Sequence, residues 1–235
     1  MENNAQALAK KAAGYRAADM VRPGMIVGLG TGSTVYYAME RLRERLAQGL
    51  ACEGVPTSFQ TALRAREYGI PLTTLDEYPD LDVAIDGADQ VDPRLRLIKG
   101  RGAAQTREKI VAEAAKSFIV IVDESKMTES LSAPVPIEVI PYAVTPVLNR
   151  LRGMGGLPEV RQGVQKDGPV ITDNGNFVID CRFKKISNPE KLEIQLTGIP
   201  GVVESGIFAH YTKKTIVIIG GKDGCRILPS PDIVP

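Results

Sequence analysis

Short apolar runs alternate along this chain with segments in which apolar residues recur at helical spacing. Runs typical of buried strands occupy Met25–Leu29, Val55–Phe59, Leu72–Leu75, Val83–Ile85, Phe118–Val122 and Thr215–Ile219. Helical spacing marks Asn4–Met20, Val35–Leu46, Ala62–Tyr68 and Ala104–Ala115. Along the first of these helices, Ala5, Leu8, Ala12 and Tyr15 fall on one face. Strands that alternate with helices predict a mostly parallel sheet with helical crossovers.

The pattern changes near Ala133-Pro134-Val135-Pro136. From there it predicts, in order, a strand at Ile137–Ile140, a helix at Thr145–Arg152, strands at Glu159–Gln162 and Phe177–Phe183, a helix at Pro189–Leu196 and a strand at Val202–Ile207. This β-α-β-β-α-β order is ferredoxin-like. We therefore expect an α/β protein. A Rossmann-like, mostly parallel sheet domain would span 1–133 plus 209–235, and an inserted ferredoxin-like α+β domain would span 134–208.

Glycine and polar residues cluster directly after several predicted strands. These segments are Gly28–Thr34, Asp86–Asp89 and Lys99–Lys109. Because ligands of open α/β sheets bind outside the carboxyl ends of the strands, we expect the three segments to meet at one small anionic substrate. A phosphate-type loop, two carboxylates and a Lys/Glu pair favour an enzyme that acts on a sugar phosphate.

The first segment joins a strand to a helix, where main-chain N–H groups and the helix dipole favour a phosphate. The hydroxyls of Thr31, Ser33 and Thr34 can add donors, and Ser33 or Thr34 can cap the helix. The loop is neither a dinucleotide fingerprint nor a Walker A motif, since Gly32 stands where the latter needs Lys. A phosphate monoester therefore fits better than a dinucleotide or ATP. A Gly-rich turn with an ordinary helix cap is the alternative.

Asp86 and Asp89 flank Gly87-Ala88, so both can face one cleft. Two acceptor side chains there can hold sugar hydroxyls or relay their protons. Paired carboxylates also suit a divalent metal ion, and Asp residues commonly cap turns, so these two alternatives stay open.

Lys99 precedes Gly100-Arg101-Gly102, and Glu108 stands near the start of the helix that follows. The helix dipole would lower the pKa of Glu108, and only burial against apolar neighbours would raise it toward the range of a general base. Solvated charges in a first helical turn are the alternative, which suits Arg107, Lys109 and Glu113 best. Lys126, after the Phe118–Val122 strand, can neutralise a phosphate or an anionic intermediate, or be solvated.

Composition narrows the classes of function. Lys and Arg total 29 against 28 for Asp and Glu, which favours neither nucleic acid nor a membrane surface as a partner. His210 is the one histidine of the chain, so a His-based triad or a multi-His metal site is excluded. The widely separated Cys52, Cys181 and Cys225 argue against a disulfide framework and predict free thiols in a cytoplasmic protein. We expect no signal peptide and no membrane span.

Taken together and in order, the motifs resemble ribose-5-phosphate isomerase of type A. The resemblance rests on Gly30–Thr34, Asp86–Asp89, Lys99–Lys109, the Asp-x-Ser-Lys pattern ending at Lys126, Pro136–Val139, Thr172–Asn176 and Ile199–Val203. It implies interconversion of D-ribose 5-phosphate and D-ribulose 5-phosphate through a cis-enediol, in the non-oxidative pentose phosphate pathway. No metal or organic cofactor is implied, and the family is commonly dimeric or tetrameric.

The resemblance also implies roles for individual residues. Glu108 matches the family's base, while Lys99 would stabilise the enediolate and Asp86 and Asp89 would assist ring opening and proton movement. The substrate would be lined by Thr31, Gly32, Ser33, Thr34, Asp86, Gly87, Ala88, Asp89, Lys99, Gly100, Arg101, Gly102 and Lys126.

Two positions depart from the family's pattern: Arg101 replaces a glycine and Gln90 replaces a glutamate. Arg101 would be strained only if its φ were positive, and we expect that it is not. For Gln90 we expect a modest change in local pKa values and the same reaction. A coenzyme A transferase of related fold and a non-catalytic sugar-phosphate sensor are the competing functions.

Overall fold

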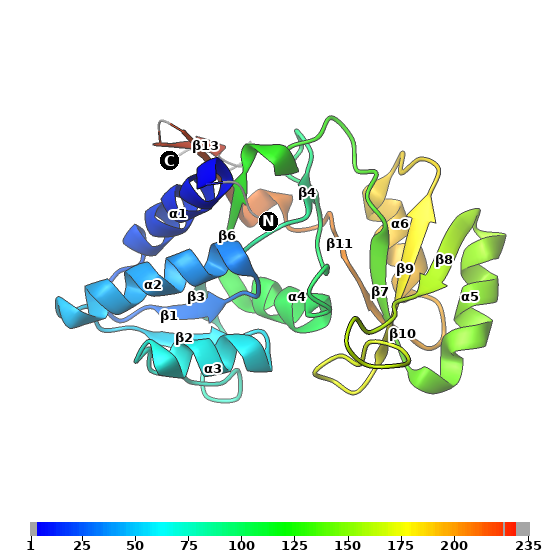
Figure 1. Cartoon of the computed structure of the whole chain (residues 1–235), viewed down its shortest axis with the longest axis horizontal. Helices are drawn as coiled ribbons and strands as arrows, with labels where there is room; N and C mark the ends of the chain where they lie inside the picture. Colours follow the sequence, from blue (N-terminus) through cyan, green and yellow to red (C-terminus); the bar gives the residue numbers. More distant parts are fainter. Residues whose placement is uncertain (1–3, 223, 229–235) are drawn as a thin grey trace. The chain divides into compact units, whose positions relative to one another are not determined.

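A six-stranded sheet in the order β13-β12-β6-β3-β1-β2 organises the larger part of the chain (Figure 1). The computed structural model describes residues 4–222 and 224–228. Neighbouring strands from β2 to β12 are parallel, and β13 pairs antiparallel with β12. The strands are β1 (Ile26–Leu29), β2 (Glu53–Pro56), β3 (Leu81–Asp86), β6 (Ala115–Asp123), β12 (Thr215–Gly221) and β13 (Gly224–Leu228). The mostly parallel sheet expected from the sequence is confirmed.

Both faces of the central strands are covered, which explains why β1 and the Phe118–Val122 part of β6 are apolar and buried without interruption. On one face, alternate residues such as Val27 and Ile85 share a core with the first two helices. On the other face, a Cβ added to Gly28 would lie 2.3 Å from the Val111 side chain. The helices of this part are α1 (Asn4–Asp19), α2 (Ser33–Ala47), α3 (Phe59–Glu67) and α4 (Gln105–Ala114).

Helix α1 packs through small residues, and on a different face from the one expected. Its buried residues include Ala9, Ala13 and Ala17, whereas Leu8 is 60% exposed. Gly14 lies so close to α2 that an added Cβ would be 2.8 Å from the Ala38 nitrogen. Because the two helix backbones lie this close, only small side chains fit between them.

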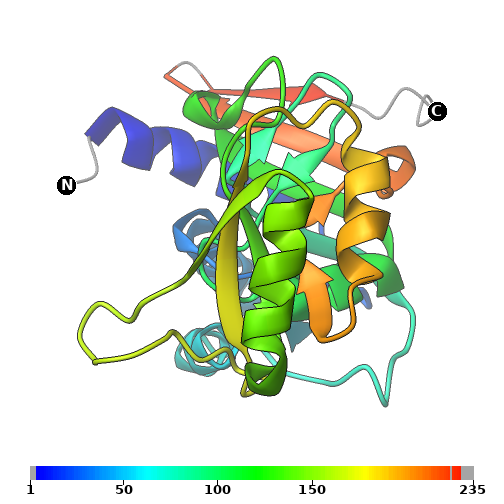
Figure 2. The ribbon, with the colours of Figure 1, turned by 90° about the vertical axis from the view of Figure 1, so that its right-hand side faces the viewer.

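A second, four-stranded sheet follows the ferredoxin-like order β10-β7-β9-β8, with all neighbours antiparallel. Figure 2 shows its two helices side by side over one face of the sheet. The elements are β7 (Val135–Val139), α5 (Val144–Gly153), β8 (Gly156–Val160), β9 (Phe177–Phe183), α6 (Pro189–Thr197) and β10 (Val202–Ser205). The sheet and its two helices share a hydrophobic core, which confirms the second part of the expected fold class.

The chain divides into two compact units whose boundaries differ from those expected. Unit 1 consists of Met1–Ala88, Arg107–Met127 and Tyr211–Pro235, and unit 2 of Asp89–Thr106 and Thr128–His210. Residues 89–106, expected in the larger domain, fall in unit 2 because they form a small sheet with its last strand. That sheet has the order β11-β5-β4, from β4 (Gln90–Val91), β5 (Leu97–Ile98) and β11 (Ile207–Phe208).

Several local expectations were wrong. Strand β2 ends at Pro56, and Ser58 caps α3 by accepting the Thr61 N–H at 3.0 Å. Of Leu72–Leu75, Leu72 forms an isolated bridge to Gly54. The strand expected at Val202–Ile207 is divided between β10 and β11. The described residues also form three short 3-10 helices, η1 (Glu124–Lys126), η2 (Pro141–Ala143) and η3 (Thr212–Lys214).

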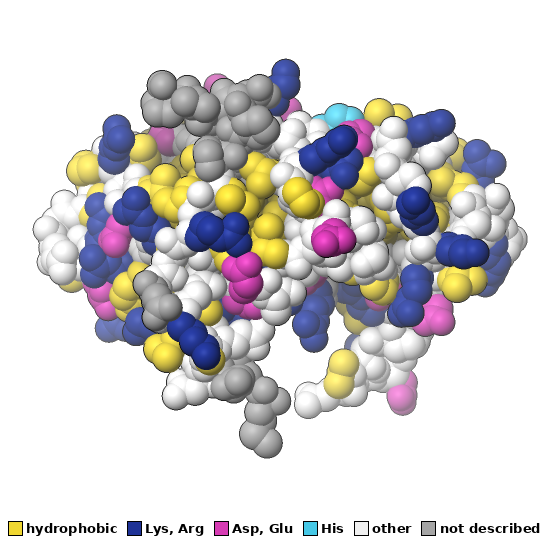
Figure 3. Space-filling model, turned by 90° about the horizontal axis from the view of Figure 1, so that it is seen from above, with side chains coloured by type: hydrophobic (Ala, Val, Ile, Leu, Met, Phe, Trp, Pro, Cys, Tyr) yellow, Lys and Arg dark blue, Asp and Glu magenta, His cyan; other side chains and the backbone are white. Residues whose placement is uncertain are grey.

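Within the described residues, no helix is long and apolar enough to cross a membrane. On the face drawn in Figure 3, Lys and Arg side chains are interspersed with acidic and hydrophobic ones. That face therefore has no large area of a single charge.

Candidate active site

The topology of unit 1 defines where a ligand is expected. The chain runs from β1 to β2 on one side, and β3 then pairs on the other side of β1. The crevice outside the carboxyl ends of strands at such a reversal is the usual ligand site of an open α/β sheet. Two of the segments singled out from the sequence, after β1 and after β3, lie at this reversal.

Asp86, the last residue of β3, holds these two segments together. Its buried side chain accepts the Thr31 N–H at 3.2 Å and the Gly87 N–H at 2.7 Å, both through Oδ1. Gly30 makes this approach possible, since a Cβ there would lie 2.1 Å from the same oxygen. The Asp86 carboxylate therefore fixes the conformation of the loop that follows β1.

The Thr31 hydroxyl takes part in a cluster of hydroxyls. It lies 2.9 Å from Thr57 Oγ1, 2.8 Å from Ser58 Oγ and 3.2 Å from Thr61 Oγ1. Thr61 in turn donates to the Gly30 carbonyl at 2.8 Å. The cluster stabilises the loop, and it leaves the hydroxyls of Ser33 and Thr34 as the expected side-chain donors to a phosphate.

The residue that caps α2 is not the one expected. The helix begins at Ser33, so the N-cap is Gly32 with φ 128°, and neither Ser33 nor Thr34 caps it. Beside Gly32 there is open space, because an added Cβ would meet nothing within 4 Å. A helix N-terminus without a side-chain cap offers its N–H groups to an anion.

Sequence reasoning missed Lys10. Its Nζ lies 3.0 Å from Ser33 Oγ and adds a cation beside the N-terminus of α2. Four residues earlier on α1, Gln6 donates to Asp123 Oδ2 at 3.2 Å. Polar residues spaced by four on an otherwise Ala-rich helix face were the signal for this contact.

Glu108 lies in the first turn of α4 and is 5% exposed. It shares the sheet-facing side of α4 with Val111, three residues later. Arg107 extends over the Phe59 ring at 4.8 Å, and Lys109, expected to be solvated, is buried. Glu108 thus meets the condition of burial that a catalytic carboxylate was expected to need.

Asp123, at the end of β6, caps the turn that bears Lys126. Its Oδ1 accepts the N–H and the hydroxyl of Ser125. Burial raises the pKa of Asp123, but the hydrogen bonds from Ser125 and Gln6 outweigh it and hold the pKa below its usual value. Lys126 follows at the end of η1, half-buried.

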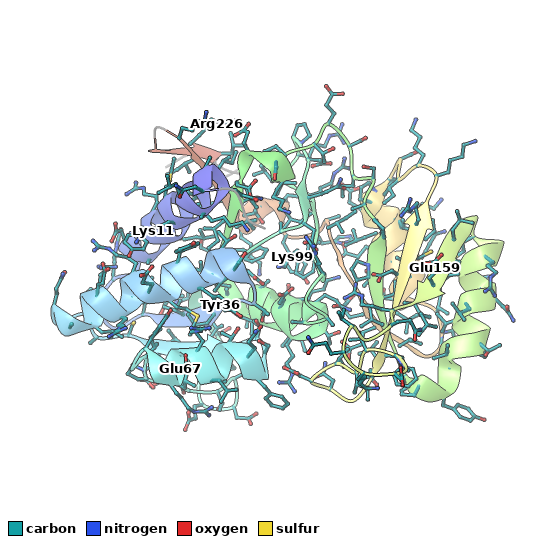
Figure 4. The ribbon with its side chains drawn as sticks, in the orientation of Figure 1. Lys11, Tyr36, Glu67, Lys99, Glu159 and Arg226 are labelled. Atoms are coloured by element: carbon teal, nitrogen blue, oxygen red, sulfur yellow. The ribbon has the colours of Figure 1, made fainter. Side chains whose placement is uncertain are left out.

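Unit 2 contains the Lys99–Gly102 loop, in which the lysine is labelled in Figure 4. Lys99 is 2% exposed, and its Nζ lies 5.5 Å from the centroid of the Phe208 ring. Positive φ angles in this region fall on Gly100 (106°) and Ala103 (59°) rather than on Arg101. The replacement of glycine by Arg101 therefore brings no left-handed strain, as expected.

Asp89 contacts the same loop within unit 2. Its Oδ2 accepts the Arg101 N–H at 3.0 Å. The neighbouring Gln90, the second departure from the family's pattern, accepts the N–H groups of Ser132 and Ala133 at 2.8 and 2.9 Å. Gln90 thus fixes a nearby main-chain segment.

Glu138 on β7 is a buried carboxylate that gathers four donors. Its Oε1 accepts from Thr172 Oγ1, Asn174 Nδ2 and Asn176 Nδ2 at 2.7, 3.0 and 2.8 Å. Its Oε2 accepts from the hydroxyl of Thr106, the second residue of α4. Two motifs that had no assigned role, at 136–139 and 172–176, therefore hold the start of the helix that bears Glu108.

The residues expected at the site fall into two groups. Unit 1 contains Thr31–Thr34, Asp86–Ala88, Glu108 and Lys126, and unit 2 contains Asp89 with Lys99–Gly102. The chain passes between the units at 88–89 and again at 106–107, next to the acidic residues of interest. Among the described residues, no group of three or more His, Cys, Asp or Glu side chains is arranged to hold a metal ion.

Known proteins match this chain along nearly its whole length. The family model for ribose 5-phosphate isomerase A (phosphoriboisomerase A) matches residues 53–224. Ribose-5-phosphate isomerase A of Methanoregula boonei is 60% identical over 232 residues, which cover 99% of this chain and 98% of that protein.

Solved structures agree with the sequence matches. A D-ribose-5-phosphate isomerase in complex with phospho-erythronic acid has a TM-score of 0.92 at 48% identity, covering 97% of this chain and 100% of that one. Ribose 5-phosphate isomerase A of Methanocaldococcus jannaschii has a TM-score of 0.90 at 46% identity, covering 94% and 98%.

The fold, the acidic and basic side chains after the strands and these matches define an enzyme of the isomerase class. More narrowly, the chain belongs to the ribose 5-phosphate isomerase A family.

Proposed function

We propose that Glu108 is the base by which this protein interconverts D-ribose 5-phosphate and D-ribulose 5-phosphate. The carboxylate would remove the proton from the carbon beside the carbonyl and return it to the neighbouring carbon, by way of a cis-enediol. The observation that carries the proposal is the burial of Glu108, 5% exposed in the first turn of α4. His210, the usual type of base at neutral pH, is bonded instead to Glu193 at 2.7 Å.

The phosphate of the substrate would bind at the N-terminus of α2. The main-chain N–H groups there, the hydroxyls of Ser33 and Thr34 and the Lys10 ammonium supply donors and positive charge. Lys126 would add a second cation. With the phosphate bound there, the acidic residues and Lys99 would act on the carbons and oxygens of the sugar.

Lys99 would stabilise the negative oxygen of the enediolate, where a buried cation acts most strongly. Asp86 and Asp89 would accept protons from sugar hydroxyls during ring opening and between the two oxygens of the enediol. The remaining residues of the three loops would line the substrate through main-chain atoms: Thr31, Gly32, Gly87, Ala88, Gly100, Arg101 and Gly102.

The test compares ribulose 5-phosphate formation by the wild-type protein and by Glu108→Gln, with EDTA present. A positioned base contributes about 10²–10⁴-fold, so kcat of the variant should fall by at least that range while ribose 5-phosphate still binds. Glu113→Gln, an exposed change on the same helix, is the matched control and should retain wild-type kcat.

Other outcomes would contradict the proposal. Equal kcat for Glu108→Gln and the wild type would mean that another group is the base. Binding of ribose 5-phosphate without turnover by the wild type would support a sugar-phosphate sensor. Release of a free thiol from an acyl-coenzyme A would support a coenzyme A transferase.

We further propose that the protein forms a homodimer or homotetramer in the cytoplasm. The free thiols of Cys52, Cys181 and Cys225 suit a reducing compartment. Phe59 and Leu63, on one face of α3, are 60% and 61% exposed and are candidates for a subunit interface. Light scattering of the purified protein would determine the assembly, and fractionation of cells its location.

A further inference from the structure

The Lys99–Gly102 loop is held by a residue that is distant from it in the sequence. Arg161 follows directly after β8, and its Nη1 donates to the carbonyl oxygens of Gly100 and Arg101, each at 3.0 Å. All of these residues belong to unit 2. The guanidinium therefore bridges two successive peptide groups of the loop.

Arg161 is itself fixed in orientation. Its Nε and Nη2 donate to the two carboxylate oxygens of Asp180 on β9, at 2.7 and 2.5 Å. Its main-chain N–H donates to the Val178 carbonyl at 2.8 Å. A bidentate pair holds the guanidinium plane, and the side chain is only 17% exposed, so the four-stranded sheet supplies a rigid support.

The same peptide group is held at both ends. In a trans peptide the carbonyl and the following N–H point in opposite directions, and the described chain contains no cis bond. The carbonyl of the 100–101 peptide accepts from Arg161, while its N–H donates to Asp89 Oδ2 at 3.0 Å. Because the next carbonyl also accepts from Arg161, the Gly102 N–H points to the side of the loop away from that guanidinium.

We propose that Arg161 is a positioning residue for the isomerisation. By fixing two peptide groups it sets the direction of the loop's N–H groups and of the chain that begins at Lys99. A loop that moves when this support is lost would misplace the groups that meet the enediolate. This inference rests on the proposed role of the Lys99–Gly102 loop and adds a residue that would act through that loop rather than on the reacting atoms.

The test is Arg161→Lys, which keeps the charge but not the planar fork. Arg96→Lys is the matched control, since Arg96 lies in the same unit, is 14% exposed and pairs with the carboxylates of Asp92 and Glu190. We expect kcat/KM of Arg161→Lys to fall by about tenfold or more, mostly in kcat, because misplacement acts on the transition state. The control should stay within about twofold of the wild type.

Two further measurements separate positioning from general stability. Phospho-erythronate, whose carboxylate resembles the two oxygens of an enediolate, should lose more affinity in Arg161→Lys than ribose 5-phosphate does. In Arg161→Ala, millimolar methylguanidinium should restore part of kcat, whereas the same addition to Arg96→Ala should not. The Tm of every variant is measured as well, so that a loss of activity can be compared with the loss of stability.

The proposal is overturned if Arg161→Lys keeps wild-type kcat and KM. It is also overturned if the Arg96 variants lose as much activity for the same fall in Tm, or if methylguanidinium has no effect on Arg161→Ala. Loss of turnover in Glu108→Gln is measured separately on an intact loop, so the assigned base stands or falls independently of Arg161.

Discussion

The Asp86 carboxylate shapes the loop after β1 by accepting the Thr31 N–H at 3.2 Å, within a space that Gly30 leaves open. The side chain and the loop lie so close that the position of one determines that of the other. A catalytic or substrate-binding role for Asp86 therefore depends on a residue that has no side chain of its own.

We expect Gly30→Ala to damage the site locally. Its new Cβ would lie 2.1 Å from Asp86 Oδ1, so the carboxylate must move, at a cost of about 1–3 kcal/mol in the free energy of unfolding. kcat/KM should fall by about tenfold or more. Gly153→Ala, where an added Cβ meets nothing within 4 Å, is the control for both urea unfolding and kinetics. Full activity in Gly30→Ala would show that the loop tolerates a displaced Asp86.

The candidate site residues could be singled out from the sequence where they stand at the end of a strand, as Asp86 does at the end of β3. Their partners could not. Lys10 reaches Ser33 from a helix 23 positions earlier, and Arg161 reaches Gly100 from 61 positions later. No local periodicity links such positions, since folding alone brings them together.

Among the elements, α4 bears both Thr106 and the proposed base, Glu108. The hydroxyl of Thr106 donates to the buried Glu138, which also accepts hydrogen bonds from side chains of the 172–176 turn. A helix start tied in this way by a side-chain hydroxyl has less freedom to fray than one exposed to water.

Glu138→Gln should weaken this arrangement while keeping its shape. The Thr106 hydroxyl can turn to accept from the new amide, so the loss is mainly that of charge-assisted bonds, about 1.5–3 kcal/mol in the free energy of unfolding. Urea unfolding measures it, and hydrogen exchange at the start of α4 should rise. Glu159→Gln, an exposed change on β8 labelled in Figure 4, should alter stability by about 0.5 kcal/mol or less. Equal effects of the two variants would contradict a structural role for Glu138.

Element type was predictable from periodicity for the long helices and the buried strands, but not for the short ones. Strands β4, β5 and β11 contain two residues each, too few to show any alternation. These strands connect 89–106 to unit 2. Since the sequence pattern does not predict them, the expected domain boundary differs from the observed one. The boundary between β2 and α3 was misjudged because the apolar Phe59 extends the strand pattern past the Ser58 cap.

At the scale of the whole molecule, each unit encloses a core that contains one cysteine. Cys52 belongs to the core of unit 1, and Cys181 to that of unit 2. Burial raises the pKa of Cys181 to about 12. Cys225 on β13 is exposed, although partial burial also raises the pKa of its thiol. The two buried thiols therefore report on the integrity of the two cores.

In the native protein at pH 8, we expect a thiol reagent to modify Cys225 and to leave Cys52 and Cys181 intact. The thiolate is the reactive form, and for Cys181 a pKa of about 12 leaves only about one thiol in 10⁴ ionised at that pH. Mass mapping of the labelled peptides measures this, with the urea-unfolded protein as the control in which all three react. Rapid native labelling of Cys181 would show that the unit 2 core opens readily.

The division of the chain into interleaved segments has a consequence for how the protein is made. Unit 2 receives its last residue at His210, whereas the sheet of unit 1 still lacks β12 and β13 at that point of synthesis. The N-terminus leaves the ribosome first. The four-stranded sheet of unit 2 can therefore be complete while the edge of β6 that will pair with β12 is still unpaired. The nascent chain must keep that apolar edge from pairing with other chains until its final strands emerge.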